Sequence, residues 1–303
     1  MRSALFLNRE LESRLDGVVD AIKNGFIEKG YEFKLVRSLH DCEDCDIIIY
    51  ECPQGWAVPD FTVSGKVFVY TTTIRTEEGQ HTPLDYVNPK ILEHASGLTG
   101  ILTAGCNEEA LSVYRKAGLA VVNMLGNIPL DESQYYDKGM ERDLSSIFIG
   151  NAYHKSDQFK KFIVPFSREV ECLFITPPGN EEVVNMAEGE KRFLSLNASS
   201  VNELFNRSKL VPVIHWPGQP ELNPRLITAI GSGALPISDN KALVKQFYDG
   251  LIPCSDDPSE WISMAKKYLS DEGERRTLVK KLREICVQRY SNVALVEKLE
   301  SVR

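Results

Sequence analysis

Short apolar runs alternate with helical patterns along the whole chain. In the first half, these runs are continuously apolar, which is typical of parallel strands buried on both faces. They cover residues 4–7, 33–36, 46–50, 66–71, 100–103 and 120–123. Between the first two runs, apolar residues recur at helical spacing from Leu15 to Phe26, and another helical pattern ends at Gly118.

The second half repeats this alternation. Its predicted strands are 146–149, 171–176, 210–215, 234–237 and 251–254, and its predicted helices are 223–232, 241–248, 259–269, 273–290 and 292–302. The pattern predicts an α/β fold with two Rossmann-like, doubly wound domains, which we expect to face each other across a cleft. We place the boundary in the polar stretch 137–143. This gives an N-terminal domain over 1–143 and a C-terminal domain over 144–303 that includes the terminal helices.

The charge is unevenly distributed between the two halves. The chain has 303 residues and a net charge of −8. Residues 1–143 contain 14 Lys and Arg against 23 Asp and Glu, a net charge of −9, so the remainder carries +1. An acidic first half disfavours extensive binding to the phosphate backbone of a nucleic acid.

Nothing in the sequence predicts a membrane segment or a secreted protein. No apolar run approaches the roughly 20 residues of a membrane helix, and the apolar start before Asn8 is too short for a signal-peptide core. The seven cysteines are scattered and odd in number, which argues against a disulfide framework. Cys42-x-x-Cys45 lacks the second pair of a typical zinc site. We therefore expect a cytoplasmic protein without a bound metal or cofactor.

The most informative stretch begins at His215. A predicted strand ends there, and a loop rich in Pro and Gly follows, including Gly218. Asn223 is a good helix N-cap and Pro224 suits the first helical position. A helix N-terminus at the carboxyl end of a strand is a ready site for phosphate, and Arg225 would add a guanidinium that suits phosphate oxygens. The alternative is that the glycines serve packing and Arg225 is a solvated charge.

This stretch resembles a known family. The run IHWPGQPELNPRLITAIGSGALPISDN, followed by DDPSEW, LSDEGERRTL and RY, is similar to the donor domain of GT-B glycosyltransferases, and most similar to the spore-maturation-type (CgeB-like) group. SSIFIGNAYHKSDQF resembles the entry to the same domain, so the resemblance spans roughly residues 145–290. For residues 1–144 it is general, a Rossmann-like half with GILTAGCNEEALSVYRKAGLAVVNML.

The resemblance implies transfer of a hexosyl or pentosyl group from a nucleotide-diphosphate sugar, UDP-linked, to an acceptor hydroxyl. In such enzymes, helix amides and a basic side chain neutralise the departing diphosphate without a metal. One departure is Thr228, which stands where the family usually has a glutamate for the ribose, so either the donor sits differently or catalysis has been lost. The implied donor-binding residues are Asn8, Asn151, Lys155, His215, Gly218, Asn223, Arg225 and Thr228.

Two of these residues have open alternatives. Lys155 could be a solvated lysine at a helix start, and His215 a hydrogen-bonded histidine packed under the loop. If the reaction inverts, a general base would come from the N-terminal domain, on the acceptor side. The candidates are Glu51, just after the third strand, and His81, in the polar loop 76–83.

Two further functions stay open. A DNA-modifying glycosyltransferase acting on hydroxymethylated bases would keep the fold and the chemistry, although the acidic N-terminal half disfavours it. A non-catalytic nucleotide-sugar-binding protein would keep the donor site alone. Binding of NAD is disfavoured, because Leu7-Asn8-Arg9-Glu10 stands where a Gly-x-Gly-x-x-Gly would follow the first strand.

Overall fold

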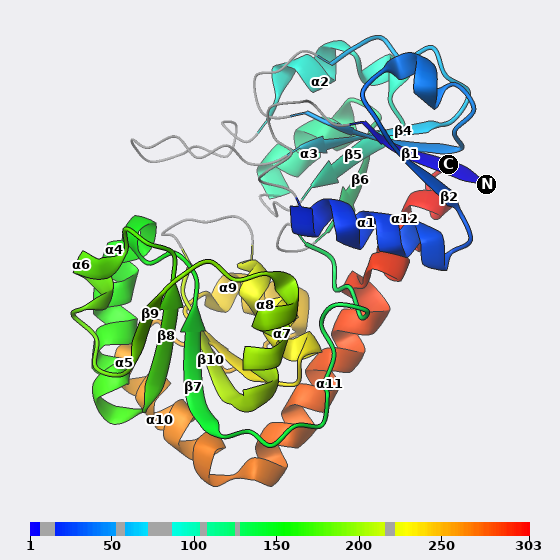
Figure 1. Cartoon of the computed structure of the whole chain (residues 1–303). Helices are drawn as coiled ribbons and strands as arrows, with labels where there is room; N and C mark the ends of the chain where they lie inside the picture. The colour runs from blue at the N-terminus through cyan, green and yellow to red at the C-terminus, as the bar shows by residue number, and fades with distance from the viewer. Residues whose placement is uncertain (7–15, 53–57, 72–86, 104–107, 125–127, 216–221) are drawn as a thin grey trace. The chain divides into compact units, whose positions relative to one another are not determined.

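The computed structural model describes residues 1–6, 16–52, 58–71, 87–103, 108–124, 128–215 and 222–303. The chain divides into two compact units, one formed by Met1–Asp131 with Arg289–Arg303 and the other by Glu132–Gln288. Each unit is built on its own sheet (Figure 1). Among the described helices, none has the length and apolar character needed to cross a membrane.

Six strands form the sheet of the first unit: β1 (Arg2–Phe6), β2 (Glu32–Val36), β3 (Ile47–Glu51), β4 (Lys66–Thr71), β5 (Gly100–Thr103) and β6 (Ala120–Asn123). They lie in the order β2-β1-β3-β4-β5-β6, and every neighbouring pair is parallel. The chain passes from β1 to β2 on one side and then to β3 on the other. The winding therefore reverses between β1 and β3, which is where ligands bind in open α/β sheets.

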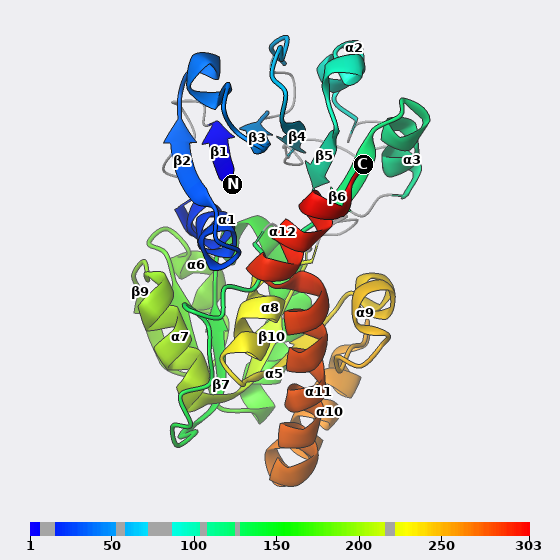
Figure 2. The same cartoon turned by 90° about the vertical axis from the view of Figure 1, so that its right-hand side faces the viewer.

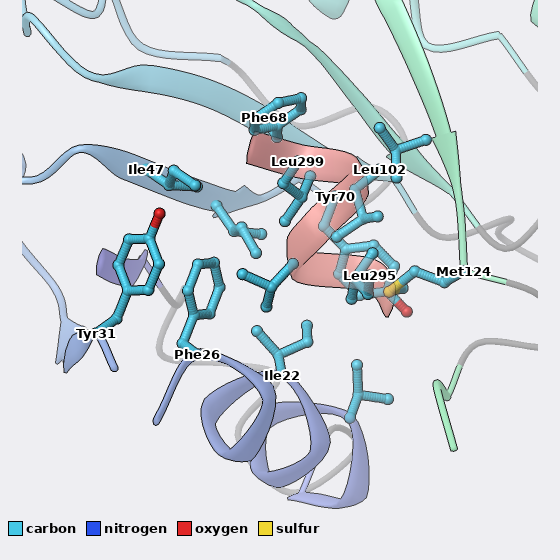
Figure 3. Close-up of a cluster of buried hydrophobic side chains, with 14 residues drawn as sticks. Ile22, Phe26, Tyr31, Ile47, Phe68, Tyr70, Leu102, Met124, Leu295 and Leu299 are labelled. Carbon is cyan, nitrogen blue, oxygen red and sulfur yellow. The ribbon is translucent and has the colours of Figure 1, made fainter. Parts of the chain in front are cut away.

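Helices cover both faces of this sheet. Their bounds are α1 (Asp16–Glu28), η2 (Leu39–Cys42), α2 (Pro89–Glu93), η4 (Ala95–Gly97), α3 (Glu108–Lys116) and α12 (Asn292–Ser301). Figure 3 shows Ile22 and Phe26 of α1 and Leu295 and Leu299 of α12 in one buried cluster with Phe68 of the sheet. Residues of α2 and α3 pack in a second cluster, on the opposite face. This burial on both faces explains why the strands are continuously apolar.

Five strands form the sheet of the second unit: β7 (Leu144–Ile149), β8 (Cys172–Thr176), β9 (Lys191–Phe193), β10 (Ser208–Val213) and β11 (Leu235–Ser238). Their order is β11-β10-β7-β8-β9, again with parallel pairs only. The winding reverses between β7 and β10. Because crossover connections are right-handed, the helices that follow β7 and β10 lie on opposite faces of the sheet.

The helices of the second unit are η5 (Tyr153–Lys155), α4 (Ser156–Gln158), η6 (Phe159–Ile163), α5 (Val164–Glu169), α6 (Glu181–Val184), α7 (Ala198–Arg207), α8 (Pro224–Gly231), α9 (Lys241–Tyr248), α10 (Pro258–Ser270) and α11 (Glu272–Tyr290). α10 packs against η6 and α5: the ring of Trp261 lies 4.9 Å from that of Phe162 in η6 and 6.4 Å from that of Phe166 in α5. α7 packs against α8.

The division between the units differs from the predicted boundary at 143/144. It falls between Asp131 and Glu132, and the last helix, α12, belongs to the first unit. Figure 2 shows α11 leading directly into α12. There the Leu130 N–H donates to the Tyr290 carbonyl at 2.8 Å, and the Asn292 N–H donates to the Leu130 carbonyl at 2.9 Å. An amphipathic pattern shows that a helix buries one face, but not which sheet it covers.

The predicted fold class is confirmed, and two strand predictions differ. Both units are Rossmann-like with parallel sheets. β9 was not predicted, since Lys191 and Arg192 give it no apolar run. Residues 251–254 form no strand beside β11; they contribute only an isolated bridge between Ser238 and Cys254.

Candidate active site

In the second unit, the predicted residues gather where the winding reverses. Lys155 follows β7 and Ile214 follows β10, so both lie at the carboxyl edge of the sheet. The Lys155 Nζ donates to the Ile214 carbonyl at 2.9 Å. This bond connects the two sides of the switch point, so Lys155 is not a solvated lysine.

The first turn of α8 begins at the same edge. Asn223 is its N-cap, with Pro224 in the first turn, as predicted. The Asn223 Oδ1 accepts from the Arg225 N–H at 3.1 Å, and its Nδ2 donates to the Ile214 carbonyl at 3.2 Å. The Ile214 carbonyl therefore holds both Lys155 and the N-cap. A positive helix terminus and a lysine ammonium both favour an anion here.

Arg225 adds a third positive group. Its side chain is half-buried, and burial lowers the pKa of the guanidinium, with an opposing contribution from Tyr135. Among the described residues, no carboxylate forms an ion pair with it. A guanidinium removed from water without a counter-charge is costly, so the site is suited to an anion that would pair with it.

His215 occupies an interior position. Its side chain is 2% exposed, and Nδ1 lies 2.6 Å from an oxygen of Asp239. Nε2 accepts from the Asn223 N–H at 3.1 Å. Both ring nitrogens thus have protein partners, which matches the alternative of a hydrogen-bonded, buried histidine. Its effect on a ligand would pass through α8.

The other donor-binding predictions have mixed outcomes. Asn151 is exposed after β7, and its Oδ1 accepts from the Tyr153 N–H at 3.0 Å. Thr228 is 1% exposed and donates to the Pro224 carbonyl at 3.1 Å, so its hydroxyl faces its own helix. Three predicted residues lie outside the described ranges: the donor-binding candidates Asn8 and Gly218, and the general-base candidate His81.

In the first unit, Glu51 ends β3 beside the switch point. Its side chain is 1% exposed, and Oε2 has no hydrogen-bond partner in the described part of the chain. Burial raises the pKa of Glu51 from 4.5 to about 7. A carboxyl group with a pKa near neutrality can take up a proton at physiological pH, which is what a general base requires.

A row of polar residues at the same edge was missed by the sequence analysis. Thr71 ends β4, Thr103 ends β5 and Asn123 ends β6, and the register pairs Thr71 with Thr103 and Thr103 with Asn123. Their side chains therefore lie on one face of the sheet. The sequence offered a signal for them, because each is a polar residue directly after a run of apolar residues in its strand. Asp239 was missed in the same way, directly after β11.

The described residues contain no cluster of three or more metal-ligand side chains. Cys42 and Cys45 are both buried in an apolar cluster of the first unit. Burial raises the pKa of the Cys42 thiol to about 11, which makes it a poor nucleophile. This pair therefore has a packing role.

Comparisons with known proteins agree with this architecture. Residues 180–301 match a family model described as glycosyl transferase-like. The structure is similar to an α-glucosyltransferase in complex with UDP and a 13-mer DNA containing an HMU base, with a TM-score of 0.65 and 15% identity over 100% of this chain and 99% of that chain. It is also similar to AviGT4, a glycosyltransferase involved in avilamycin A biosynthesis (TM-score 0.63, 12% identity, 100% and 98% covered).

A third similar structure is the DNA-modifying enzyme β-glucosyltransferase, with a TM-score of 0.61 and 12% identity over 99% of this chain and 98% of that chain. A search of the curated proteins found no match. Two Rossmann-like units with these likenesses define the GT-B fold. Within it, the part of the chain that includes α8 and the terminal helices is glycosyl transferase-like.

Proposed function

We propose that this protein is a glycosyltransferase that binds a UDP-linked sugar at the second unit and transfers the sugar to an acceptor hydroxyl. The observation that carries this proposal is that Lys155 and the first turn of α8, which includes Arg225, meet at one switch point, while no carboxylate of the described residues forms an ion pair with Arg225. A helix N-terminus with an arginine in its first turn and a lysine at the same sheet edge suits a diphosphate better than a neutral ligand.

The chemistry follows from the charges of the two sites. The first unit supplies the base: Glu51 takes the proton of the acceptor hydroxyl, whose oxygen then bonds to the anomeric carbon of the donor. The bond from that carbon to the diphosphate breaks, and UDP leaves with the electron pair. Lys155, Arg225 and the N-terminus of α8 stabilise the negative charge that develops on the leaving diphosphate. Attack opposite the leaving group inverts the anomeric configuration.

The finer assignments belong to the same proposal. The donor sugar is a hexose or a pentose, the protein acts in the cytoplasm, and donor binding needs no divalent metal. The spore-maturation-type group is the subgroup that the motifs around His215 favour. A cleft between the two units, with the acceptor on the first, stays a prediction.

A DNA acceptor is the second candidate. One of the similar structures is a glucosyltransferase in complex with DNA, and another is a DNA-modifying glucosyltransferase. The net charge of −9 over residues 1–143 disfavours it. Fluorescence anisotropy with duplex DNA at 50 and 200 mM salt distinguishes a DNA acceptor from other acceptors. A nucleic-acid acceptor requires micromolar or tighter binding that weakens steeply with salt, and we expect neither.

Calorimetric titration tests the donor site directly. UDP and UDP-glucose should bind with similar affinity in EDTA and in Mn²⁺, whereas orthophosphate should bind far more weakly. Loss of UDP binding in EDTA would overturn metal independence. Absence of binding by any nucleoside diphosphate or nucleotide sugar, from a folded sample, would overturn the proposed donor site.

A further inference from the structure

Asp239 is a buried carboxylate that directly follows β11. Its side chain is 6% exposed, and within the described part of the chain its hydrogen bonds come from His215. The His215 backbone N–H lies 3.0 Å from each carboxylate oxygen, and the ring Nδ1 lies 2.6 Å from Oδ1. A buried carboxylate needs such donors, because without them its desolvation would be strongly unfavourable.

This arrangement fixes the tautomer of the imidazole. A carboxylate only accepts hydrogen bonds, so Nδ1 carries the proton and donates it to Asp239. Nε2 then keeps a lone pair, and that lone pair accepts from the Asn223 N–H at 3.1 Å. The imidazole therefore connects the end of β11 to the N-cap of α8.

The hydrogen bond from Asn223 to His215 affects the candidate diphosphate site, because Asn223 caps α8. With its N–H held by His215, Asn223 uses its side-chain oxygen to cap the Arg225 N–H and its side-chain amide to reach the Ile214 carbonyl. Each polar group of Asn223 thus has a fixed direction. We propose that Asp239 and His215 are positioning residues, which hold the first turn of α8 and its Arg225 in place for the donor diphosphate. The identity of that ligand rests on the proposed function.

The positioning needs a neutral imidazole. A protonated ring would present an N–H at Nε2 to the N–H of Asn223, and the contact would be lost. Burial lowers the pKa of His215; Asp239 opposes this effect, and the nearby ammonium of Lys155 adds to it. The ring is therefore neutral at pH 7, and the connection weakens only in acid.

Two substitutions at His215 distinguish the effect of its hydrogen-bond acceptor from the effect of its side-chain volume. His215→Leu keeps volume but removes the acceptor, whereas His215→Gln places an amide oxygen near the position of Nε2. We expect His215→Leu to weaken UDP binding about tenfold, and His215→Gln to restore most of that loss. Asp239→Asn should weaken binding by a smaller factor. His40 is the matched control, because it also pairs with a carboxylate, at 2.8 Å from Glu43, but is exposed. His40→Leu should leave UDP affinity unchanged.

Hydrogen exchange of the Asn223 amide gives a readout that needs no nucleotide. Protection should fall in His215→Leu and persist in His215→Gln. Equal protection in wild type and His215→Leu would overturn the hydrogen bond. Loss of protection without any loss of UDP affinity would overturn the positioning role. If wild type fails to bind UDP, the proposed function fails, while the exchange data still decide whether His215 holds the first turn of α8.

The pH profile distinguishes this role from simple stabilisation. UDP affinity of wild type should fall more steeply with increasing acidity than that of His215→Gln, since glutamine does not titrate. Parallel profiles would contradict the requirement for a neutral imidazole.

Discussion

The two sheets have switch points of the same kind, but they carry opposite charges there. In the first unit, the carboxyl edge holds Glu51, an acidic group with one oxygen that finds no hydrogen-bond partner among the residues that the structure describes. In the second unit, the same edge holds Lys155, Arg225 and a helix N-terminus. Parallel topology explains why both sites lie at carboxyl edges, while the residues that end each strand decide their chemistry.

Burial acts differently on the two charges. A desolvated carboxyl group can become neutral by binding a proton, and the pKa of Glu51 rises to about 7 accordingly. Arg225 stays protonated despite a lowered pKa, so the burial of its charge is best compensated by an anion. One edge is thus suited to moving a proton and the other to holding a phosphate.

The largest effect is expected from Glu51→Gln. Removing a general base lowers kcat by roughly 10²- to 10⁴-fold, while UDP affinity should stay unchanged because the donor site lies in the other unit. Initial rates of UDP release and a UDP titration measure the two quantities. Glu109→Gln, at an exposed carboxylate, is the control. Full activity in Glu51→Gln would remove Glu51 from the mechanism.

Glu51→Gln should be more stable than wild type in alkaline solution. The folded-state pKa of Glu51 is raised above 4.5, so its favourable contribution is complete below that pH and is lost as the pH rises through about 7. At pH 8, wild type should carry a penalty of roughly 3 kcal/mol that Glu51→Gln removes, at about 1.36 kcal/mol for each pKa unit. Urea denaturation of both proteins at pH 8 and pH 5 tests this prediction, because the difference between their free energies of unfolding should be smaller at pH 5. An equal difference at both pH values would contradict the raised pKa.

In the second unit, Arg225→Ala should weaken UDP binding about tenfold to a hundredfold, since a charge-assisted contact contributes on the order of 1.5–3 kcal/mol. Arg225→Lys should keep part of the affinity. Arg207 pairs with Asp143 on the surface, so Arg207→Ala serves as the control. Calorimetry measures all three, and thermal melts check folding. Unchanged affinity in Arg225→Ala would make this arginine a structural charge.

The smallest effect on UDP binding is expected from removing a helix N-cap, and two N-caps can be compared. Asn223 caps α8 and Asn197 caps α7, each through its side-chain oxygen. Alanine at either position should cost about 1 kcal/mol of unfolding free energy. Only Asn223→Ala should also weaken UDP binding, by a few fold, because only α8 begins at the switch point. Equal effects on UDP binding would mean that capping acts through general stability.

The sequence predicted those parts of the site that depend on local chemistry. Asn223 and Pro224 define a helix start whatever surrounds them, and continuously apolar strands predict parallel sheets. Glu51 and Lys155 were found because they follow predicted strands. Thr228 shows the limit of the resemblance: it stands where the family usually has a glutamate for the ribose, but its hydroxyl donates to the Pro224 carbonyl of its own helix.

By itself, then, the sequence determined the two-domain α/β class, most of the strands and the first turn of α8, because these depend on neighbours a few residues apart. The tertiary structure alone decided the remainder. It joined α12 to the first unit, buried Glu51 until its pKa approached 7, and brought Asp239 to His215, 24 positions earlier in the chain. Desolvation and the direction of a hydrogen bond depend on the groups that folding brings together, and those groups are distant in sequence.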